Sequence, residues 1–276
     1  EQSLNEDETI RGDRDPAKPT RGNIDVNGAI ETYIDAITFG LWLKAMFGAP
    51  STSGSGPYDH EFVVGSQPSF IIEHAFSDAG VFNAYKGCKV SSFSTEIGGE
   101  GDVRATFDIV GANPDEGNDA TVIGGPATSL AYNKFSQFQG AIQEGGSEIG
   151  IVTNVSLDVD FALDDGEENY PIGNQGIKGQ LPEGILSISG TVTAWFTDKT
   201  LLNKAIDGTE TSLKLTFTNG TNVLEHTMPE VIFERTSPGI DGPQGIMIEL
   251  PFQAYFDDST EGTALKTKLT NGHETY

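Results

Sequence analysis

The stretch GNIDVNGAIETYIDAITFGLWLKAMFG at residues 22–48 is repeated in outline by GILSISGTVTAWFTDKTLLNKAIDG at residues 184–208. Both stretches open with alternating apolar residues, a pattern typical of a strand with one buried face. Each carries a glycine at the same place in the alternation, Gly28 and Gly190. An internal repeat of this kind predicts two copies of one structural unit.

A short helix is expected after the alternating strand in both copies. Thr38 and Asp198 are candidate N-caps, because their side-chain oxygens can accept hydrogen bonds from the free amides of a first helical turn. Gly48 and Gly208 can take the left-handed conformation that ends a helix. Since start and stop recur at the same spacing, the sequence predicts two matching helices.

Further alternating segments complete each unit as strand, helix, strand, strand, strand. EFVVGSQPSFIIEHAF at residues 61–76 matches SLKLTFTNGTNVLEHTM at residues 212–228, and this match makes Glu73–His74 the counterpart of Glu225–His226. The glycine-rich residues 98–101 are expected to form a hairpin turn before the next alternating strand.

The segment around residues 111–129, GANPDEGNDATVIGGPATS, has the composition of a linker. We therefore expect a first domain at residues 1–112, a linker at 113–129 and a second domain at 130–276. Residues 130–163 are expected to form two further strands, and Val155–Phe161 shows the alternation of one of them. The first copy has only residues 3–10 in the matching place, so its first strand is either trimmed or lies partly upstream of Glu1.

Composition narrows the classes of function. The net charge is −25 and the isoelectric point is about 4.2, so the surface repels phosphate and anionic membranes, and a nucleic-acid binder is not expected. Cys88 is the single cysteine, which rules out an intrachain disulfide and a multi-cysteine metal site. No apolar run reaches about 18 residues, and the N-terminus is polar, so neither a membrane span nor a signal peptide is expected.

No motif supports enzymatic chemistry or a cofactor. Glu73–His74 and Glu225–His226 are neighbours on strands, so their side chains point to opposite faces and cannot share an acid–base site unaided. Residues 115–119 and 164–169 are acidic but lack the spacing of a calcium loop. Arg11-Gly12-Asp13 spells an adhesion tripeptide, which we interpret as coincidence in an acidic arm.

The order of these features resembles the two-domain tail tube proteins of long-tailed, siphovirus-type bacteriophages. The resemblance lies in RGNIDV at 21–26 leading to LKAMFG at 43–48, in YKGCKV at 85–90 and in LPFQAY at 250–255. It spans about residues 3–258. It implies a mainly β fold of two tandem β-sandwich or barrel-like domains, each with one short flanking α-helix, and no catalytic residue or cofactor.

The resemblance also implies assembly. Such domains join edge to edge into a ring whose inner sheets form one β-barrel around a DNA channel, and stacked rings make the tube. With two domains per chain we expect a homotrimeric ring with pseudo-sixfold symmetry, the alternative being a homohexamer. Other tail proteins are expected at the tube ends, and DNA is expected to pass without specific binding. The place expected for the protein is the virion tail, assembled in the host cytoplasm.

Two groups of residues are candidates for roles in that assembly. Asp158 and Asp160 alternate with apolar residues on one strand, and we expect both to line the channel. A basic cluster in the N-terminal arm is expected to contact the next ring: Arg11, Arg14, Lys18 and Arg21.

Two other classes of function stay open at this point. A β-sandwich binding or adhesion module of a virion or cell surface would need an exposed aromatic platform, which Trp42 and Trp195 do not suggest. A hydrolase would need an acid pair that only the fold brings together.

Overall fold

The computed structural model describes the chain except for residues 7–11, 13, 14, 126–129, 131, 198, 240–244 and 259. The described residues form mainly β-strands, which confirms the expected fold class. Two α-helices, α1 (Phe39–Phe47) and α2 (Thr200–Asp207), and two 3-10 turns, η1 (Gln137–Gln139) and η2 (Glu167–Asn169), accompany the strands. In the described part of the chain, no helix has the length and apolar character needed to span a membrane.

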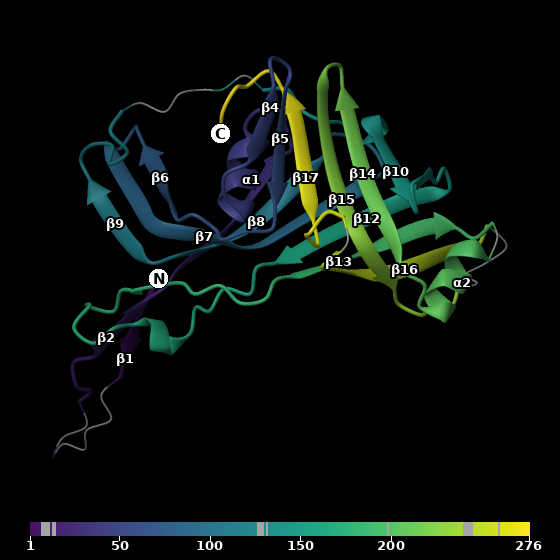
Figure 1. Ribbon diagram of the computed structural model, residues 1–276. Coiled ribbons are helices and arrows are strands. Elements are labelled where there is room, and N and C mark those ends of the chain that lie inside the picture. Colours follow the sequence, from purple (N-terminus) through teal and green to yellow (C-terminus); the bar gives the residue numbers. More distant parts are fainter. Residues whose placement is uncertain are drawn as a thin grey trace.

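A central sheet of seven strands runs through the molecule (Figure 1). In order of hydrogen bonding it contains β3 (Val26–Tyr33), β8 (Arg104–Gly111), the second half of β7 (Val81–Gly98), β12 (Val152–Asp160), β13 (Ser187–Trp195), β16 (Met247–Tyr255) and the second half of β15 (Asn222–Phe233). All neighbours are antiparallel. The predicted turn at residues 98–101 connects β7 to β8.

Two outer sheets rise from one side of the central sheet (Figure 1). The first contains β6 (Phe70–Phe76), the first half of β7 and β9 (Asn113–Asn118). The second contains β11 (Ser147–Glu148), β10 (Gly140–Glu144), β14 (Thr211–Asn219), the first half of β15, β17 (Lys266–Asn271), β5 (Tyr58–Val63) and β4 (Ser51–Gly54). Strand β7 passes from outer to central sheet near Gly87, whose φ of 66° favours glycine.

The same strand order occurs twice. β3, β8, β7 and β6 are hydrogen-bonded in that order, and so are β13, β16, β15 and β14. β9 pairs with the first half of β7 as β17 pairs with the first half of β15. Part of the expected linker is thus a strand of the repeat, whereas the division into domains at residues 112 and 130 stays a prediction.

The expected equivalence of the two Glu–His pairs is wrong. Glu73–His74 lies on β6, whereas Glu225–His226 lies on β15, which corresponds to β7. The cause is the hairpin β4–β5, which follows α1, pairs with β17 and has no counterpart after α2. The hairpin shifts the count of strands between the two copies.

Thr38 is the N-cap residue of α1, as expected, but the side-chain hydrogen bonds at this end come from Asp35. The Asp35 Oδ1 atom accepts hydrogen bonds from the amides of Ile37 and Thr38, both at 2.9 Å. The Thr38 side chain makes no capping hydrogen bond. The Asp35 carboxylate, four residues before the first residue of α1, thus holds the turn that leads into the helix.

The helix ends agree more closely with the sequence pattern. Gly208 follows α2 in the left-handed conformation, with φ 63° and ψ 34°. Gly48 also has a positive φ, 89°, but an extended ψ. At the start of α2, Asp198 lies outside the described residues, and Lys199 is the N-cap residue.

Helix α1 is wedged between the two outer sheets and above the central sheet (Figure 1). Trp42 stacks on Phe107 of β8 with ring centres 4.2 Å apart. Phe39 lies 6.3 Å from the rings of both Phe93 on β7 and His226 on β15. Burial of each phenylalanine contributes about 1.5–3 kcal/mol, so α1 is a main link between the two copies of the repeat.

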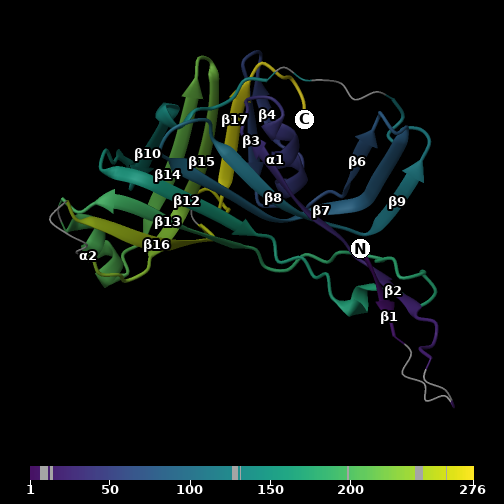
Figure 2. The same ribbon diagram turned by 180° about the vertical axis from the view of Figure 1, so that it is seen from behind.

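An extension projects away from the sheets (Figure 2). It consists of the hairpin β1 (Gln2–Asn5) and β2 (Thr20–Ile24), together with the excursion at residues 161–186. The Tyr170 hydroxyl donates to Asp25 Oδ1 at 2.5 Å, and the Lys178 ammonium lies 3.3 Å from the same oxygen. The hydrogen bond from Tyr170 lowers the pKa of Asp25. We call the described residues of 1–25 and 161–186 the spur.

Candidate functional surface: the polar face of the central sheet

One face of the central sheet is covered by the outer sheets and α1, and the opposite face carries polar side chains. Leu157 and Val159 of β12 are buried on the covered face, at 0% and 1% exposed. Asp158 and Asp160 alternate with them and are exposed. The structure thus places both candidate lining residues on the same polar face.

Cross-strand pairing aligns the polar side chains in rows. One row crosses all seven strands and contains Glu31, Thr106, Ser94, Asp158, Ser189, Gln253 and Ile232. Next to it, the Ser92 hydroxyl donates to the Asp108 carboxylate at 2.6 Å. Hydroxyl and carboxylate groups dominate this surface.

Acidic residues outnumber basic ones on the face. The acidic residues that the pairing places there are Glu31, Glu96, Asp108, Asp158, Asp160, Glu230 and Glu249. Two basic residues, Arg104 and Lys89, lie on the same strands. Arg104 is paired with Glu31 and Lys89 with Glu183, each at 2.5 Å, so neither offers an unpaired positive charge.

A shallow hollow of about 540 Å³ lies on this face. Its lining includes Glu31, Glu96, Asp102, Arg104, Ser156 and Asp158. Partial burial in the hollow raises the pKa of Asp158. The hollow gathers carboxylates around one arginine, and such a surface repels phosphate.

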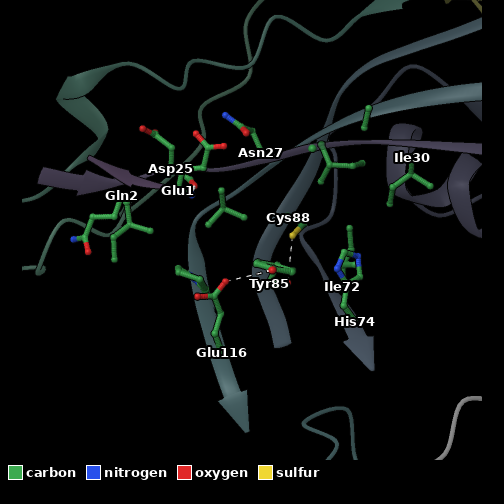
Figure 3. Close-up of a pocket in the computed structure, with 16 residues that line it drawn as sticks. Glu1, Gln2, Asp25, Asn27, Ile30, Ile72, His74, Tyr85, Cys88 and Glu116 are labelled. Carbon is green, nitrogen blue, oxygen red and sulfur yellow. Dashed lines mark hydrogen bonds between the residues drawn. The ribbon is translucent and has the colours of Figure 1, made fainter. Parts of the chain in front are cut away.

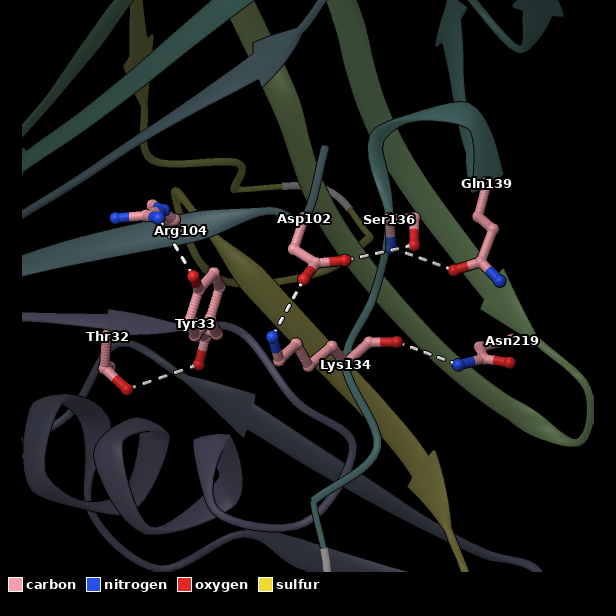
Figure 4. Close-up of polar contacts among 8 residues, drawn as sticks. All are labelled: Thr32, Tyr33, Asp102, Arg104, Lys134, Ser136, Gln139 and Asn219. Carbon is pink, nitrogen blue, oxygen red and sulfur yellow. Dashed lines mark hydrogen bonds and ion pairs between the residues drawn. The ribbon is translucent and has the colours of Figure 1, made fainter. Parts of the chain in front are cut away.

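A polar cluster fixes the loop before η1 to the end of the polar face (Figure 4). The Lys134 ammonium lies 2.9 Å from Asp102 and 3.7 Å from the centre of the Tyr33 ring. The Arg104 guanidinium lies 4.6 Å from the same ring. Two cations are thereby held by aromatic and acidic groups of the protein itself.

A groove of about 550 Å³ opens between β3 and the first outer sheet (Figure 3). Ile72, Tyr85 and Ile109 form apolar walls, and Glu116 projects from β9 beside Tyr85. The Tyr85 hydroxyl donates to Glu116 at 3.3 Å. Cys88 lines the groove, and burial raises its pKa to about 11, which leaves the thiol protonated and a poor nucleophile at neutral pH.

The basic cluster of the arm is described in part. Lys18 and Arg21 are exposed on the spur, whereas Arg11 and Arg14 lie outside the described residues. The sequence did not indicate that residues 161–186 share the spur with the arm. Its glycines and prolines predict turns, and no local signal reveals their contact with β2.

The other candidate motifs have structural partners. Glu73 accepts hydrogen bonds from the Val122 amide at 2.6 Å and the Thr121 hydroxyl at 2.9 Å. Glu225 pairs with Lys214 at 2.5 Å and Lys268 at 2.8 Å. Across the described residues, no three His, Cys, Asp or Glu side chains are grouped to hold a metal ion.

The two tryptophans do not form a platform for a ligand. Trp42 is partly buried and stacked on Phe107, and Trp195 lies at the far end of β13, 43% exposed. Their separation on different elements gives the adhesion-module alternative no support.

One comparison with known families gives a match. A protein-family model with the description phage tail tube protein matches residues 1–254. No curated protein matches the chain at a significant level.

Proposed function

The chain belongs to the phage tail tube protein family, and from this premise we propose that three copies close into a ring with pseudo-sixfold symmetry. It is a structural component of a phage tail. The observation that carries the ring is the repeated strand order, β3–β8–β7–β6 and β13–β16–β15–β14. Three chains supply six copies of that order.

The junction between repeats inside the chain supports this closure. The second half of β7 pairs with β12, and β12 pairs with β13, so the two repeats already share one continuous sheet. Beside β3, the described residues leave the place that corresponds to β12 open. On β15, strand β14 reaches as far as Val231, and the outer edge is open beyond it, at Ile232 and Phe233. Open strand edges pair readily with further strands, and in a ring these two edges face each other.

The size of the ring follows from the strand count. Each chain contributes the seven strands of its central sheet, and one further strand can pair with the open edge of β3, which makes eight strand positions per chain. Three chains then give about 24 positions, and at ~4.8 Å spacing the circumference is roughly 115 Å. A strand tilt of ~40° widens the diameter to about 45–50 Å, which leaves room for a DNA duplex after side chains are added.

The polar face is the proposed lining of the channel. Its carboxylates, among them Asp158 and Asp160, repel DNA phosphate, and its two cations are already paired. Electrostatic attraction is the main source of non-specific binding to DNA. Because the described part of this face offers no free cation to phosphate, DNA can slide through without specific contacts.

The spur is the proposed contact between stacked rings. It extends beyond the sheets and carries the exposed Lys18 and Arg21, opposite in sign to most of the surface. Complementary charge favours docking on an acidic neighbour. The ends of the tube would contact other tail proteins in a siphovirus-type virion, assembled in the host cytoplasm.

Cryo-electron microscopy of the assembled protein tests the ring. The expected cross-section holds three chains, with alternating first and second repeats in one barrel. Six chains per ring, or a second repeat outside the barrel, would overturn the trimer.

Charge reversal tests the lining. Asp158→Lys combined with Asp160→Lys is expected to preserve tubes but make them retain added DNA in a gel-shift assay. Asp78→Lys, on the exposed turn between β6 and β7, is the control and should not retain DNA. Equal retention of DNA by both variants would show that the polar face does not line the channel.

Truncation tests the spur. Protein that lacks residues 1–20 loses β1 but keeps every strand of the central sheet. It is expected to form rings that stack poorly, as seen in negative-stain images. Normal tubes from this variant would mean that the arm has no role in stacking.

A further inference from the structure

Helix α1 has one side covered by the second outer sheet of its own chain. The Tyr276 hydroxyl donates to the Ile37 carbonyl at 2.8 Å, and the Asn271 side chain donates to the Ala36 carbonyl. Phe39 packs edge to face on His226 of β15, 6.3 Å away. A helix of the first repeat therefore seals against the outer sheet of the second repeat.

The position that corresponds to His226 follows from the register of the central sheet. Val90 pairs with Ile109 as Phe233 pairs with Phe252. Seven residues before Val90 and Phe233 lie Asn83 and His226, which makes these two counterparts.

Asn83 belongs to the groove region of the first outer sheet. It pairs with His74 of β6, and the Gly117 amide donates to its side chain at 2.9 Å. His74 and Glu116, the neighbour of Gly117, both line the groove (Figure 3). This part of the first outer sheet is where a helix would pack if the contact of α1 were repeated.

Burial differs sharply between the two counterpart regions. His226 and Leu215, its partner on β14, are 2% and 1% exposed. In the first outer sheet, His74 and Glu116 are exposed. The first sheet thus has an uncovered surface where the second is sealed.

Helix α2 is the matching uncovered element. Lys199 precedes Gly208 by nine residues as Phe39 precedes Gly48. Lys199 is exposed, and Ile206 is 43% exposed. The position that is aromatic in α1 is therefore cationic in α2, and the groove that would receive it carries the carboxylate of Glu116.

We infer that the groove beside β3 receives helix α2 of a neighbouring copy, with Lys199 of one chain paired with Glu116 of the next. This contact rests on the proposed ring, in which the second repeat of each chain adjoins the first repeat of its neighbour. Ile206 lies against the apolar walls of the groove. The internal contact combines the Phe39 ring with hydrogen bonds to the backbone, whereas the contact between chains joins opposite charges, so a chain can fold first and associate afterwards.

A charge swap tests the pair. Lys199→Glu and Glu116→Lys place like charges together, and each is expected to raise the critical concentration for assembly at least about tenfold. The double variant restores opposite charges and should assemble close to wild type. Thermal melting checks that each variant folds, and Lys199→Gln and Glu116→Gln give milder effects in the same direction. Asp78→Lys on the same outer sheet is the matched control.

A second measurement separates this contact from the ring itself. Carbodiimide treatment of assembled wild-type protein should join Lys199 to Glu116 between differently labelled chains, as read by mass spectrometry. Rings without this cross-link, or single reversals that assemble like wild type, would overturn the helix contact and leave the ring intact. Wild-type protein that forms no rings would overturn the ring and the contact with it.

Discussion

Gly28 on β3 and Gly190 on β13 occupy corresponding positions, and substitution by alanine is expected to have opposite effects on stability at the two. The difference tests whether the edge of β3 is open. A Cβ atom at Gly190 would overlap the carbonyl oxygen of Ser156 on β12 and come within 2.7 Å of the Phe252 ring. A Cβ atom at Gly28 meets nothing within 4 Å. The difference arises because β12 covers β13, whereas the corresponding place beside β3 is open.

The magnitudes follow from that geometry. Gly190→Ala forces strands apart in a packed sheet, at a cost of about 1–3 kcal/mol. At about 2–4 °C per kcal/mol, the melting temperature should fall by roughly 2–12 °C. Gly28→Ala removes backbone freedom from an uncrowded strand and should stabilise the unassembled chain by about 0.5–1 kcal/mol.

In the assembled ring, the substitution Gly28→Ala is expected to be unfavourable. If a strand covers β3 in the ring as β12 covers β13, its carbonyl will meet the new methyl group. Gly28→Ala will then assemble poorly although its unassembled chain is slightly more stable than wild type. Differential scanning calorimetry of the unassembled protein and sedimentation of the tubes measure the two effects. Wild-type assembly of Gly28→Ala would refute the idea that β3 is paired in the ring as β13 is in the chain.

Three further predictions concern the fold. Trp42→Ala removes the ring stacked on Phe107 and should lower the free energy of unfolding by about 3–5 kcal/mol, measured by urea denaturation; an effect below 1 kcal/mol would contradict the anchoring role of α1. Burial lowers the pKa of His226 to about 4. Between pH 6.5 and pH 4 the unfolded chain therefore binds a proton at this histidine and the folded chain does not. The free energy of unfolding should fall by about 3 kcal/mol as the pH falls from 6.5 towards 4. In His226→Phe the melting temperature should change less over that range, and an unchanged pH dependence would exclude His226 as its source. Cys88 should react with a thiol reagent at pH 8 only after denaturation, because burial raises its pKa to about 11; rapid labelling of native protein would show that the groove opens.

Local periodicity predicted the strands that build the polar face. Alternation in β12 separates Leu157 and Val159 from Asp158 and Asp160, and the structure buries the first pair and exposes the second. A strand with one buried face carries this information in its own residues. Local patterns of this kind also made the mainly β fold and both helices predictable.

Contacts between distant segments were not predictable. The linker composition of residues 113–118 conceals β9, which pairs with β7. The hairpin β4–β5 pairs with β17 near the other end of the chain. Because the second copy lacks this hairpin, the sequence match placed the two Glu–His pairs on strands that do not correspond. Pairing of this kind depends on which edges the rest of the fold leaves open, and a single strand carries no record of its partner.

The distribution of charge explains how open edges and solubility coexist in one chain. Open edges favour association with any strand, whereas a net charge of −25 opposes the approach of identical chains. Association must then rely on a few places where opposite charges meet, and the exposed Lys18, Arg21 and Lys199 lie on the spur and at α2, away from the acidic polar face. Under the proposed assembly, the same excess of carboxylates that keeps DNA from binding the channel also favours those contacts between chains in which cations such as these take part.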